Sequence, residues 1–243
     1  MSSLQPHEEV TRITKFLRAN LGKAPAVIGV SGGIDSAVVL HLLSRAVPAD
    51  KIMAFYLPEK DSNDANRNDI NELSRSSGIA INTIEIGLAT NALIEMLHPS
   101  DRVSTGNMKS RVRMTVLYYF ANANSGKVVG TTNRTEFMVG YYTKFGDGAC
   151  DMEPIMHLLK RQVRELAAYL GVPKSVIEKK PTAGLWAGQT DEEELGMTYD
   201  QMDAAIERIF DQKMAPQSQA EKRVMELYNS SEHKRRLPLS LLG

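Results

Sequence analysis

The residues whose types and spacing can do chemistry begin with an octet at positions 29–36. The octet is Gly29, Val30, Ser31, Gly32, Gly33, Ile34, Asp35 and Ser36. Two adjacent glycines permit a tight turn that brings backbone N–H groups close to an anion. The two serines add hydroxyl donors, and a helix starting near Asp35 would direct its positive end to the same place. Together these features predict a phosphate-binding loop.

Two common phosphate-binding patterns do not fit this loop. No Gly-Lys-Ser/Thr follows the glycines, as a Walker A loop requires, and the GxGxxG fingerprint is missing too. A plain Gly-Gly turn that caps a helix with Ser or Asp remains an alternative. Asp35 is unexpected beside phosphates, because a carboxylate repels them. Either a metal ion lies between the two, or Asp35 caps the helix.

The loop lies in a chain whose short apolar runs alternate with helical patterns. Buried strands are expected at 26–30, 52–57, 79–86 and 127–130, and helices at 6–21, 35–46, 62–77, 90–96, 107–124 and 160–170. This alternation predicts right-handed βαβ units and a doubly wound α/β fold, with a mostly parallel sheet flanked by helices. Ligands of such sheets bind beyond the carboxyl ends of the strands, where the loop is expected.

The last third of the chain, after Pro181, is expected to be mostly helical. Residues 182–194 hold two glycines, one tryptophan and four consecutive acids, which is typical of a flexible surface segment. We expect this segment to order over bound substrates in the manner of a lid.

Composition narrows the class of protein. The 243 residues suit one domain spanning 1–243, and 29 basic against 29 acidic residues give no basic excess for nucleic acid. The one cysteine, Cys150, excludes an internal disulfide framework and a cysteine-rich zinc site, and is expected to be a packed small residue. Neither a signal peptide nor a membrane-spanning run is present, so we expect a cytoplasmic protein without membrane or nucleic-acid partners.

The SGGIDS loop resembles the pyrophosphate loop of the N-type ATP pyrophosphatases. Further blocks resemble motifs of the NAD synthetase family, in the family's order. These blocks are 106–114 (GNMKSRVRM), 130–136 (GTTNRTE), 140–148 (GYYTKFGDG), 180–183 (KPTA), 191–199 (DEEELGMTY) and the pair 233–234 (HK). The resemblance covers nearly the whole chain, and the combination of blocks is highly specific.

The resemblance implies an ammonia-dependent NAD synthetase with an adenine nucleotide alpha hydrolase-like fold and Mg²⁺ as cofactor. Such a ligase adenylates the nicotinate carboxylate of deamido-NAD with ATP, releases pyrophosphate, and lets ammonia displace AMP to give NAD, the last step of NAD biosynthesis. Because the loop begins near residue 29, no room precedes it for the glutaminase domain of glutamine-dependent members. The resemblance also implies a homodimer whose interface helps to form the deamido-NAD site.

The resemblance assigns roles to individual positions. ATP contacts are expected from the octet 29–36 and from Thr131, Lys160 and Thr182. Deamido-NAD contacts are expected from Arg111, Lys144, Asp151, His233 and Lys234, and metal ligation from Asp35 and Glu136. We add the hypothesis that Asp147 binds ammonium and takes its proton. Without the family match, Glu136 and Lys160 could be solvated helix charges and 233–236 a basic tail.

Other functions remain as rivals. Another ATP pyrophosphatase, such as GMP synthetase or a tRNA-modifying thiolase, would share the loop. The lack of a CxxC pair argues against the thiolase, and the blocks at 106–114 and 140–148 fit deamido-NAD better than XMP. A nucleotide-sensing module without turnover is a third reading, which the presence of both Asp35 and Glu136 disfavours.

Overall fold

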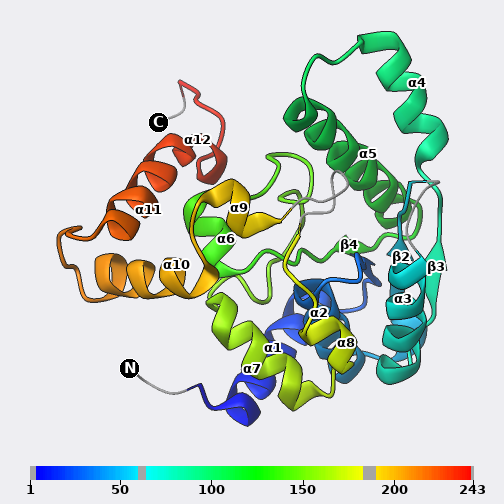
Figure 1. Ribbon diagram of the computed structural model, residues 1–243. Helices are drawn as coiled ribbons and strands as arrows, with labels where there is room; N and C mark the ends of the chain where they lie inside the picture. The colour runs from blue at the N-terminus through cyan, green and yellow to red at the C-terminus, as the bar shows by residue number, and fades with distance from the viewer. Residues whose placement is uncertain (1–3, 60–63, 183–189, 242–243) are drawn as a thin grey trace.

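The computed structural model describes residues 4–59, 64–182 and 190–241. Within them, a parallel sheet of four strands has the order β3-β2-β1-β4 (Figure 1). The strands are β1 Ala26–Gly29, β2 Ile52–Tyr56, β3 Ile81–Thr83 and β4 Lys127–Val128. Ala26 pairs with Ile52 on one side and with Lys127 on the other. The chain therefore winds outward from β1 in both directions, as the predicted doubly wound fold requires.

Helices connect and surround the strands. The α-helices are α1 Pro6–Leu21, α2 Ile34–Ala46, α3 Asp64–Ser77, α4 Gly87–Leu97, α5 Arg102–Ala123, α6 Arg134–Val139, α7 Lys160–Leu170, α8 Lys174–Ile177, α9 Asp191–Leu195, α10 Tyr199–Ile206, α11 Gln219–Ser230 and α12 Glu232–Arg235. A short 3-10 turn η1 Ala49–Lys51 precedes β2, and a π-helical turn η2 Glu207–Asp211 extends α10.

The two faces of the sheet bury alternate residues of the same strands. Ala26 and Ile28 of β1 belong to a core cluster with residues of α1, α2, α3 and α7. Val27, between them in β1, packs on the opposite face with Phe55, Val128 and residues of α5. Because neighbouring side chains of a strand point to opposite faces, β1 is covered on both sides and reads as a continuous apolar run.

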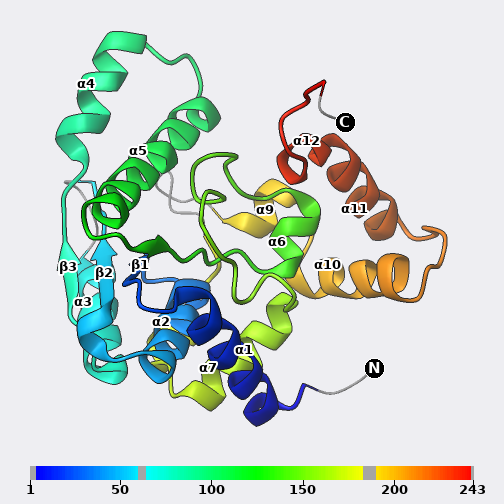
Figure 2. The ribbon, with the colours of Figure 1, turned by 180° about the vertical axis from the view of Figure 1, so that it is seen from behind.

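A third core cluster lies beyond the sheet, among α6, α9, α10 and α11. Tyr199 and Ile206 of α10 are fully buried there, against Val139 of α6 and Val224 of α11. Figure 2 shows this group of helices on the opposite side of the molecule from α3 and β3. The cluster holds α6 and the first turn of α7 in place at the edge of the sheet.

Most of the expected elements are confirmed, and α1 and α7 have the predicted ends. The third strand is shorter than expected, only Ile81–Thr83, and α5 begins at Arg102 because Asp101 caps it. Of the segment 182–194, residues 183–189 lie outside the described chain. At its end the segment is helical, because Asp191 starts α9. Asp191 is 4% exposed, whereas Glu193 and Glu194 lie at the surface as predicted. Across the described ranges no helix has the length and apolar character to cross a membrane.

Candidate active site

The octet at 29–36 connects the end of β1 to the start of α2, and residues 129–133 connect β4 to α6. Because β1 and β4 are neighbours and their connections leave in opposite directions, a crevice is expected at this switch point of the sheet. The phosphate loop and the block at 130–136 therefore meet at the carboxyl ends of the strands. Thr131, in that block, is half-buried directly after β4.

The loop is held in shape by its own hydroxyl groups. Ser36 Oγ accepts from the Ser31 backbone N–H at 3.2 Å and donates to Gly33 O at 3.0 Å. Ser31 Oγ accepts from the Gly33 backbone N–H at 3.2 Å. Gly32, at the tip, has φ +81°, a conformation that favours glycine. The loop is thus fixed in one conformation by hydrogen bonds within it, and its role in phosphate binding stays a prediction.

Asp35 does not cap α2, because the helix begins at Ile34 and its N-cap residue is Gly33. The Asp35 carboxylate instead points across to the β4–α6 connection. Its Oδ1 accepts from Asn133 Nδ2 at 2.8 Å, and its Oδ2 accepts from Lys160 Nζ at 2.6 Å. The helix-cap alternative is therefore wrong, and Asp35 belongs to a cluster of charged groups.

Lys160 is the centre of this cluster. Its Nζ lies 2.6 Å from Asp35 Oδ2 and 2.9 Å from Glu136 Oε1, and 4.7 Å from the centre of the Tyr199 ring. The residue is 2% exposed, so it is not the helix surface charge that its sequence context allowed. Burial works against the ammonium charge, but the charges of Asp35 and Glu136 outweigh it and raise the pKa of Lys160. The lysine is firmly cationic.

Glu136 is not a solvated helix charge either. Burial raises the pKa of Glu136 to about 7, the charge of Lys160 opposes this rise, and the nearby Asp35 adds to it. Its Oε1 also lies 3.2 Å from the Tyr199 hydroxyl, which is 2.9 Å from Asp191 Oδ2. Two acids, Asp35 in the first turn of α2 and Glu136 in the first turn of α6, therefore converge on one cation, and a tyrosine from α10 contacts Glu136.

A buried carboxylate fixes the N-terminus of α7, and with it Lys160. Asp203 of α10 is 1% exposed and accepts from the backbone N–H of Arg161 at 2.9 Å. The Thr135 hydroxyl donates to Asp203 at 2.5 Å and accepts from the Lys160 backbone N–H at 3.0 Å. Burial raises the pKa of Asp203, and its hydrogen bonds with Thr135 and Arg161 oppose that rise. Asp203 thus caps α7 from another helix.

The Asp35–Glu136 pair has the oxygen donors that a cation site requires. Both carboxylates lie within hydrogen-bonding distance of one ammonium, so they can share a single positive ion. Among the residues that the structure describes, no group of three or more His, Cys, Asp or Glu side chains could hold a metal. Magnesium commonly takes one or two protein carboxylates and completes its shell with phosphate oxygens and water. The pair fits that pattern.

A second group unites four of the five positions expected at deamido-NAD. Arg111 of α5 donates from Nη2 to Lys144 O at 3.2 Å, and Lys144 Nζ donates to His233 O at 2.6 Å. Lys234 Nζ donates to Gly140 O at 2.6 Å and to Tyr142 O at 2.7 Å. Lys234 and Arg235 are therefore half-buried against neighbouring backbone carbonyls and not part of a solvated tail, whereas His233 and Arg236 are exposed. The result is a concentration of cations beside the loop at 140–148.

Asp147 lies in the same loop, on a backbone that only glycines allow. A Cβ on Gly146 would lie 2.4 Å from Ser110 Oγ. Asp147 Oδ1 accepts from Ser110 Oγ at 2.6 Å and from the Thr143 N–H at 3.0 Å, so the carboxylate has a fixed orientation. Its charge works to raise the pKa of Lys234, whose pKa burial lowers overall. Asp147 is exposed and close to the cations.

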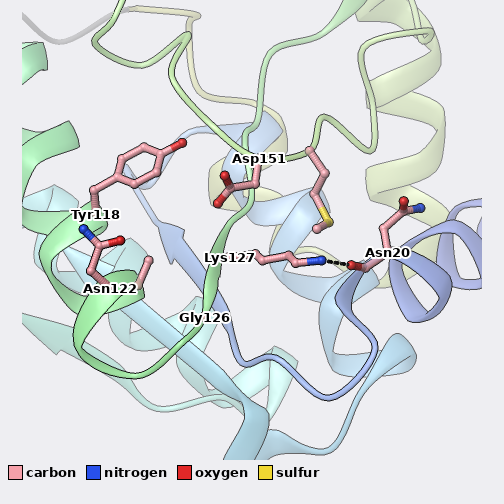
Figure 3. Close-up of a pocket in the computed structure, with 8 residues that line it drawn as sticks. Asn20, Tyr118, Asn122, Gly126, Lys127 and Asp151 are labelled. Atoms are coloured by element: carbon pink, nitrogen blue, oxygen red, sulfur yellow. Dashed lines mark hydrogen bonds between the residues drawn. The ribbon is translucent and has the colours of Figure 1, made fainter.

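Asp151, the fifth position expected at deamido-NAD, does not belong to the group of cations beside the loop at 140–148. It lines a cavity of about 220 Å³ with Asn20, Tyr118, Asn122 and Lys127, at the outer edge of β4 (Figure 3). Asp151 Oδ2 accepts from the Val128 N–H at 2.6 Å. Burial, followed by the charge of Asp151, raises the pKa of Tyr118 to about 12. The structure therefore divides the predicted deamido-NAD residues into two groups.

Sequence reasoning missed several residues of these groups, including Asn133, Tyr199, Asp203 and Glu153. Glu153 lies against the β4–α6 connection, where its Oε2 accepts from the Thr132 N–H at 3.1 Å and its Oε1 from Cys150 Sγ at 3.3 Å. Burial raises the pKa of Glu153 to about 7 and also raises that of the Cys150 thiol. Cys150 is therefore an unreactive, partly buried side chain, as expected. Thr182 is exposed at the edge of the described segment.

Comparison with known proteins identifies the family. The family model described as NAD synthase matches residues 9–238. The NH(3)-dependent NAD(+) synthetase of Thermoplasma acidophilum is 49% identical over 234 residues, which are 96% of this chain and 97% of that protein.

Two solved structures extend the similarity to the fold. An NMN synthetase from Francisella tularensis is 37% identical with a TM-score of 0.88, covering 98% of this chain and 99% of that one. An NH3-dependent NAD synthetase from Campylobacter jejuni, in complex with the nitrate ion, is 27% identical with a TM-score of 0.81, covering 98% of this chain and 100% of that one. Together with the phosphate loop, these matches show that the chain belongs to the NAD synthase family, whose curated relatives are ligases that form a C–N bond.

Proposed function

We propose that this chain is an ammonia-dependent NAD synthetase, which amidates deamido-NAD at the cost of ATP. Family membership supports the reaction, and the observation that carries its location is the convergence of Lys160, Asp35 and Glu136 beside the phosphate loop. An oxygen of the nicotinate carboxylate attacks the α-phosphorus of ATP, and the bond to the β-phosphate oxygen breaks, releasing pyrophosphate. The nitrogen of ammonia then attacks the carboxyl carbon of this adenylate. The bond between that carbon and the oxygen bound to phosphorus breaks, so AMP leaves and keeps this oxygen.

The chain's own residues account for the first step in the following way. The loop amides and the hydroxyls of Ser31 and Ser36 bind the β- and γ-phosphates. Thr131, Lys160 and Thr182 complete the ATP site in this proposal. Lys160 is a suitable phosphate ligand because its ammonium is a compact, fully protonated point charge on a flexible stem.

We propose Mg²⁺ as the cofactor, held by Asp35 and Glu136. When bound, it would neutralise charge on the departing pyrophosphate. Both carboxylates already share one cation, Lys160 Nζ, which supports their ability to share another. Magnesium titration of the protein by calorimetry tests this, with Asp35→Asn and Glu136→Gln expected to weaken binding. Unchanged affinity in both variants would remove the two residues from the metal site.

For the second step we propose that Asp147 binds ammonium and accepts a proton from it. Its fixed carboxylate and its position among Lys144, Lys234 and Arg111 support this role, because those cations are the expected contacts of deamido-NAD. Ammonium is the main species at neutral pH and has no lone pair until a proton leaves. A carboxylate both attracts the cation and takes that proton.

Nicotinate mononucleotide is a second candidate substrate, because of the similarity to a structure described as an NMN synthetase. The chemistry at the carboxylate would be the same, and the difference is the AMP half of the dinucleotide. Comparing kcat/KM for deamido-NAD and for nicotinate mononucleotide decides between them. A ratio of about tenfold or more in favour of deamido-NAD is expected if the AMP half is recognised, which corresponds to about 1.4 kcal/mol.

We propose a homodimer in which one site takes residues from both protomers. Three observations support it: the separation of Asp151 from the other four positions, the exposed Tyr119 on α5 (66% exposed), and the exposed Leu88 and Met96 of α4. Helix α5 has apolar or aromatic residues throughout 116–120, of which Val116, Leu117, Tyr118 and Phe120 pack on the core cluster at the sheet and Tyr119 does not.

Mixing two inactive variants tests this arrangement. Asp151→Ala and Lys234→Ala dimers, mixed and allowed to exchange, should regain up to about a quarter of normal activity, because half the dimers are mixed and each has one intact site. A molecular mass of a monomer in sedimentation, or no recovery on mixing, would contradict the proposal. We also propose a single domain spanning 1–243, supported by the match over nearly the whole length of the curated relatives. We further propose a cytoplasmic location, which agrees with the finding that no helix among the described residues could span a membrane. Cell fractionation tests the location.

A further inference from the structure

A second lysine lies at the phosphate loop, outside all of the positions assigned above. Lys179 follows α8, a short helix that packs against α2 (Figure 1). Its Nζ donates to Asp69 Oδ2 and to Asn66 Oδ1, both at 2.7 Å and both on α3. The side chain of Lys179 is 29% exposed, whereas Asp69 is 12% exposed. The ammonium is thus held at the edge of the site and remains accessible to a ligand.

The distance to the loop is short. A Cβ placed on Gly32 would lie 3.9 Å from Lys179 Nζ, and as close to side-chain atoms of Asp69 and Ile70. Gly32 is the tip of the loop, where backbone N–H groups are expected to hold phosphate oxygens. An anion on that tip would therefore lie within reach of the Lys179 ammonium, with only small movement of a flexible side chain.

The charges around the loop explain why a second lysine would help to bind ATP there. Lys160 faces two carboxylates, so the Lys160–Asp35–Glu136 cluster has a net charge of −1 when both acids are ionised. That cluster alone would repel a triphosphate. Lys179 faces a single carboxylate, Asp69, and two of its three N–H donors are used on Asp69 and Asn66. The third donor can bind a phosphate oxygen while the ion pair with Asp69 is kept.

We propose that Lys179 is a phosphate-binding residue, which contacts the β- or γ-phosphate of ATP and then the released pyrophosphate. This inference rests on the proposed ATP site at the same loop. Asp69 and Asn66 contact the same ammonium before ATP arrives, and the negative charge of Asp69 also opposes an anion at this position. The adjacent Lys180 is exposed and serves as a comparison of equal charge one residue away.

A merely structural role is the main alternative, in which the Lys179–Asp69 ion pair anchors the chain after α8 to α3. Two substitutions separate the roles. Lys179→Met removes the cation, whereas Asp69→Asn breaks the ion pair but keeps the cation. The double variant, Lys179→Met with Asp69→Asn, contains neither charge and so avoids leaving the Asp69 carboxylate unpaired. It replaces Lys179→Met in the binding experiment if that single variant folds poorly. Lys180→Met controls for the general loss of one positive charge.

The measurement is the dissociation constant of each variant for inorganic pyrophosphate, ATP and AMP by calorimetry. Lys179→Met and the double variant should bind pyrophosphate and ATP about ten- to a hundredfold more weakly, which is typical of a lost hydrogen bond to a charged group. Their affinity for AMP should be unchanged, and Asp69→Asn and Lys180→Met should bind pyrophosphate at least about as well as the wild type.

Two results would overturn the inference. The first is an unchanged pyrophosphate affinity in Lys179→Met. The second is an equal loss in Asp69→Asn, which would assign the effect to the ion pair. If the wild-type protein itself binds neither ATP nor pyrophosphate, the ATP site is refuted, which is distinguishable from a failure of Lys179 alone.

Discussion

Replacing Lys160 by Met should destabilise the protein strongly, and magnesium should reverse much of the effect. The substitution removes an ammonium that is 2% exposed and bonded to two carboxylates, at 2.6 and 2.9 Å. Asp35 and Glu136 would then face each other without a shared cation. Removing one partner of a buried ion pair costs about 3–5 kcal/mol. For a chain of this size that corresponds to a fall in the melting temperature of about 10 °C.

Magnesium can take the place of the lost cation, if Asp35 and Glu136 are its ligands. In the wild type the ion must compete with Lys160 for the same oxygens, whereas in Lys160→Met it meets an unpartnered pair. Saturating magnesium should therefore raise the melting temperature of the variant more than that of the wild type. The assay is thermal unfolding by differential scanning fluorimetry or calorimetry, with magnesium and with chelator.

A double variant supplies the control. Lys160→Met with Glu136→Gln leaves one carboxylate instead of two, so it should be more stable than Lys160→Met without magnesium and should respond less to the ion. A melting temperature of Lys160→Met close to that of the wild type would refute the energetic reasoning. If magnesium leaves the difference in melting temperature between the wild type and Lys160→Met unchanged, the assignment of the metal ligands is refuted.

Three further predictions concern other buried or fixed carboxylates. Glu153→Gln should flatten the dependence of stability on pH, because the pKa of Glu153 in the folded protein, about 7, lies above its unfolded value of 4.5. The free energy of unfolding of the wild type should therefore fall by roughly 3 kcal/mol as the pH rises from about 4.5 to above 7. Equal pH profiles of chemical unfolding in the two proteins would contradict this. Asp203→Ala should cost about 1–3 kcal/mol in urea unfolding and weaken ATP binding, because α7 loses its cap and Lys160 its position, whereas full ATP affinity would show that α7 does not need it. Asp147→Asn should slow amidation in single-turnover experiments more than pyrophosphate release, and equal slowing of both steps would exclude its role with ammonium.

The parts of this structure that could be predicted from the sequence are local. The phosphate loop is continuous in the chain, and its glycines and serines act within six residues of each other. Helix α7 could be bounded because Gly171 ends it and Pro173 follows. Strand β1 could be found because burial on both faces leaves an unbroken apolar run.

The parts that could not be predicted depend on contacts between distant segments. Asp203 caps α7 from 42 residues further along the chain, and Tyr199 reaches Glu136 across 63 residues. Nothing in the local sequence of Lys160 distinguishes a surface lysine from a buried one, since only the packing of α6 and α10 around it decides. For the same reason the role of Asp35 stayed open until its distance to Lys160 was known.

The family resemblance predicted which residues belong to the site but not how they are arranged in space. Arg111, Lys144, His233 and Lys234 lie in one group, whereas Asp151 lies in the cavity beside Tyr118. Lys179 escaped notice because the neighbouring Lys180 fitted the family's block, although the structure directs Lys179 to the loop. Adjacent lysines on an irregular segment point in different directions, and sequence spacing does not tell which of them faces a ligand.

The most direct test of the account is NAD formation by the purified protein with ATP, magnesium and deamido-NAD, with either ammonium or glutamine as nitrogen source. The proposed reaction predicts NAD, AMP and pyrophosphate in equal amounts with ammonium, and no NAD with glutamine alone. An absence of NAD with ammonium, in a preparation that binds ATP, would contradict the assigned reaction while leaving the phosphate loop in place.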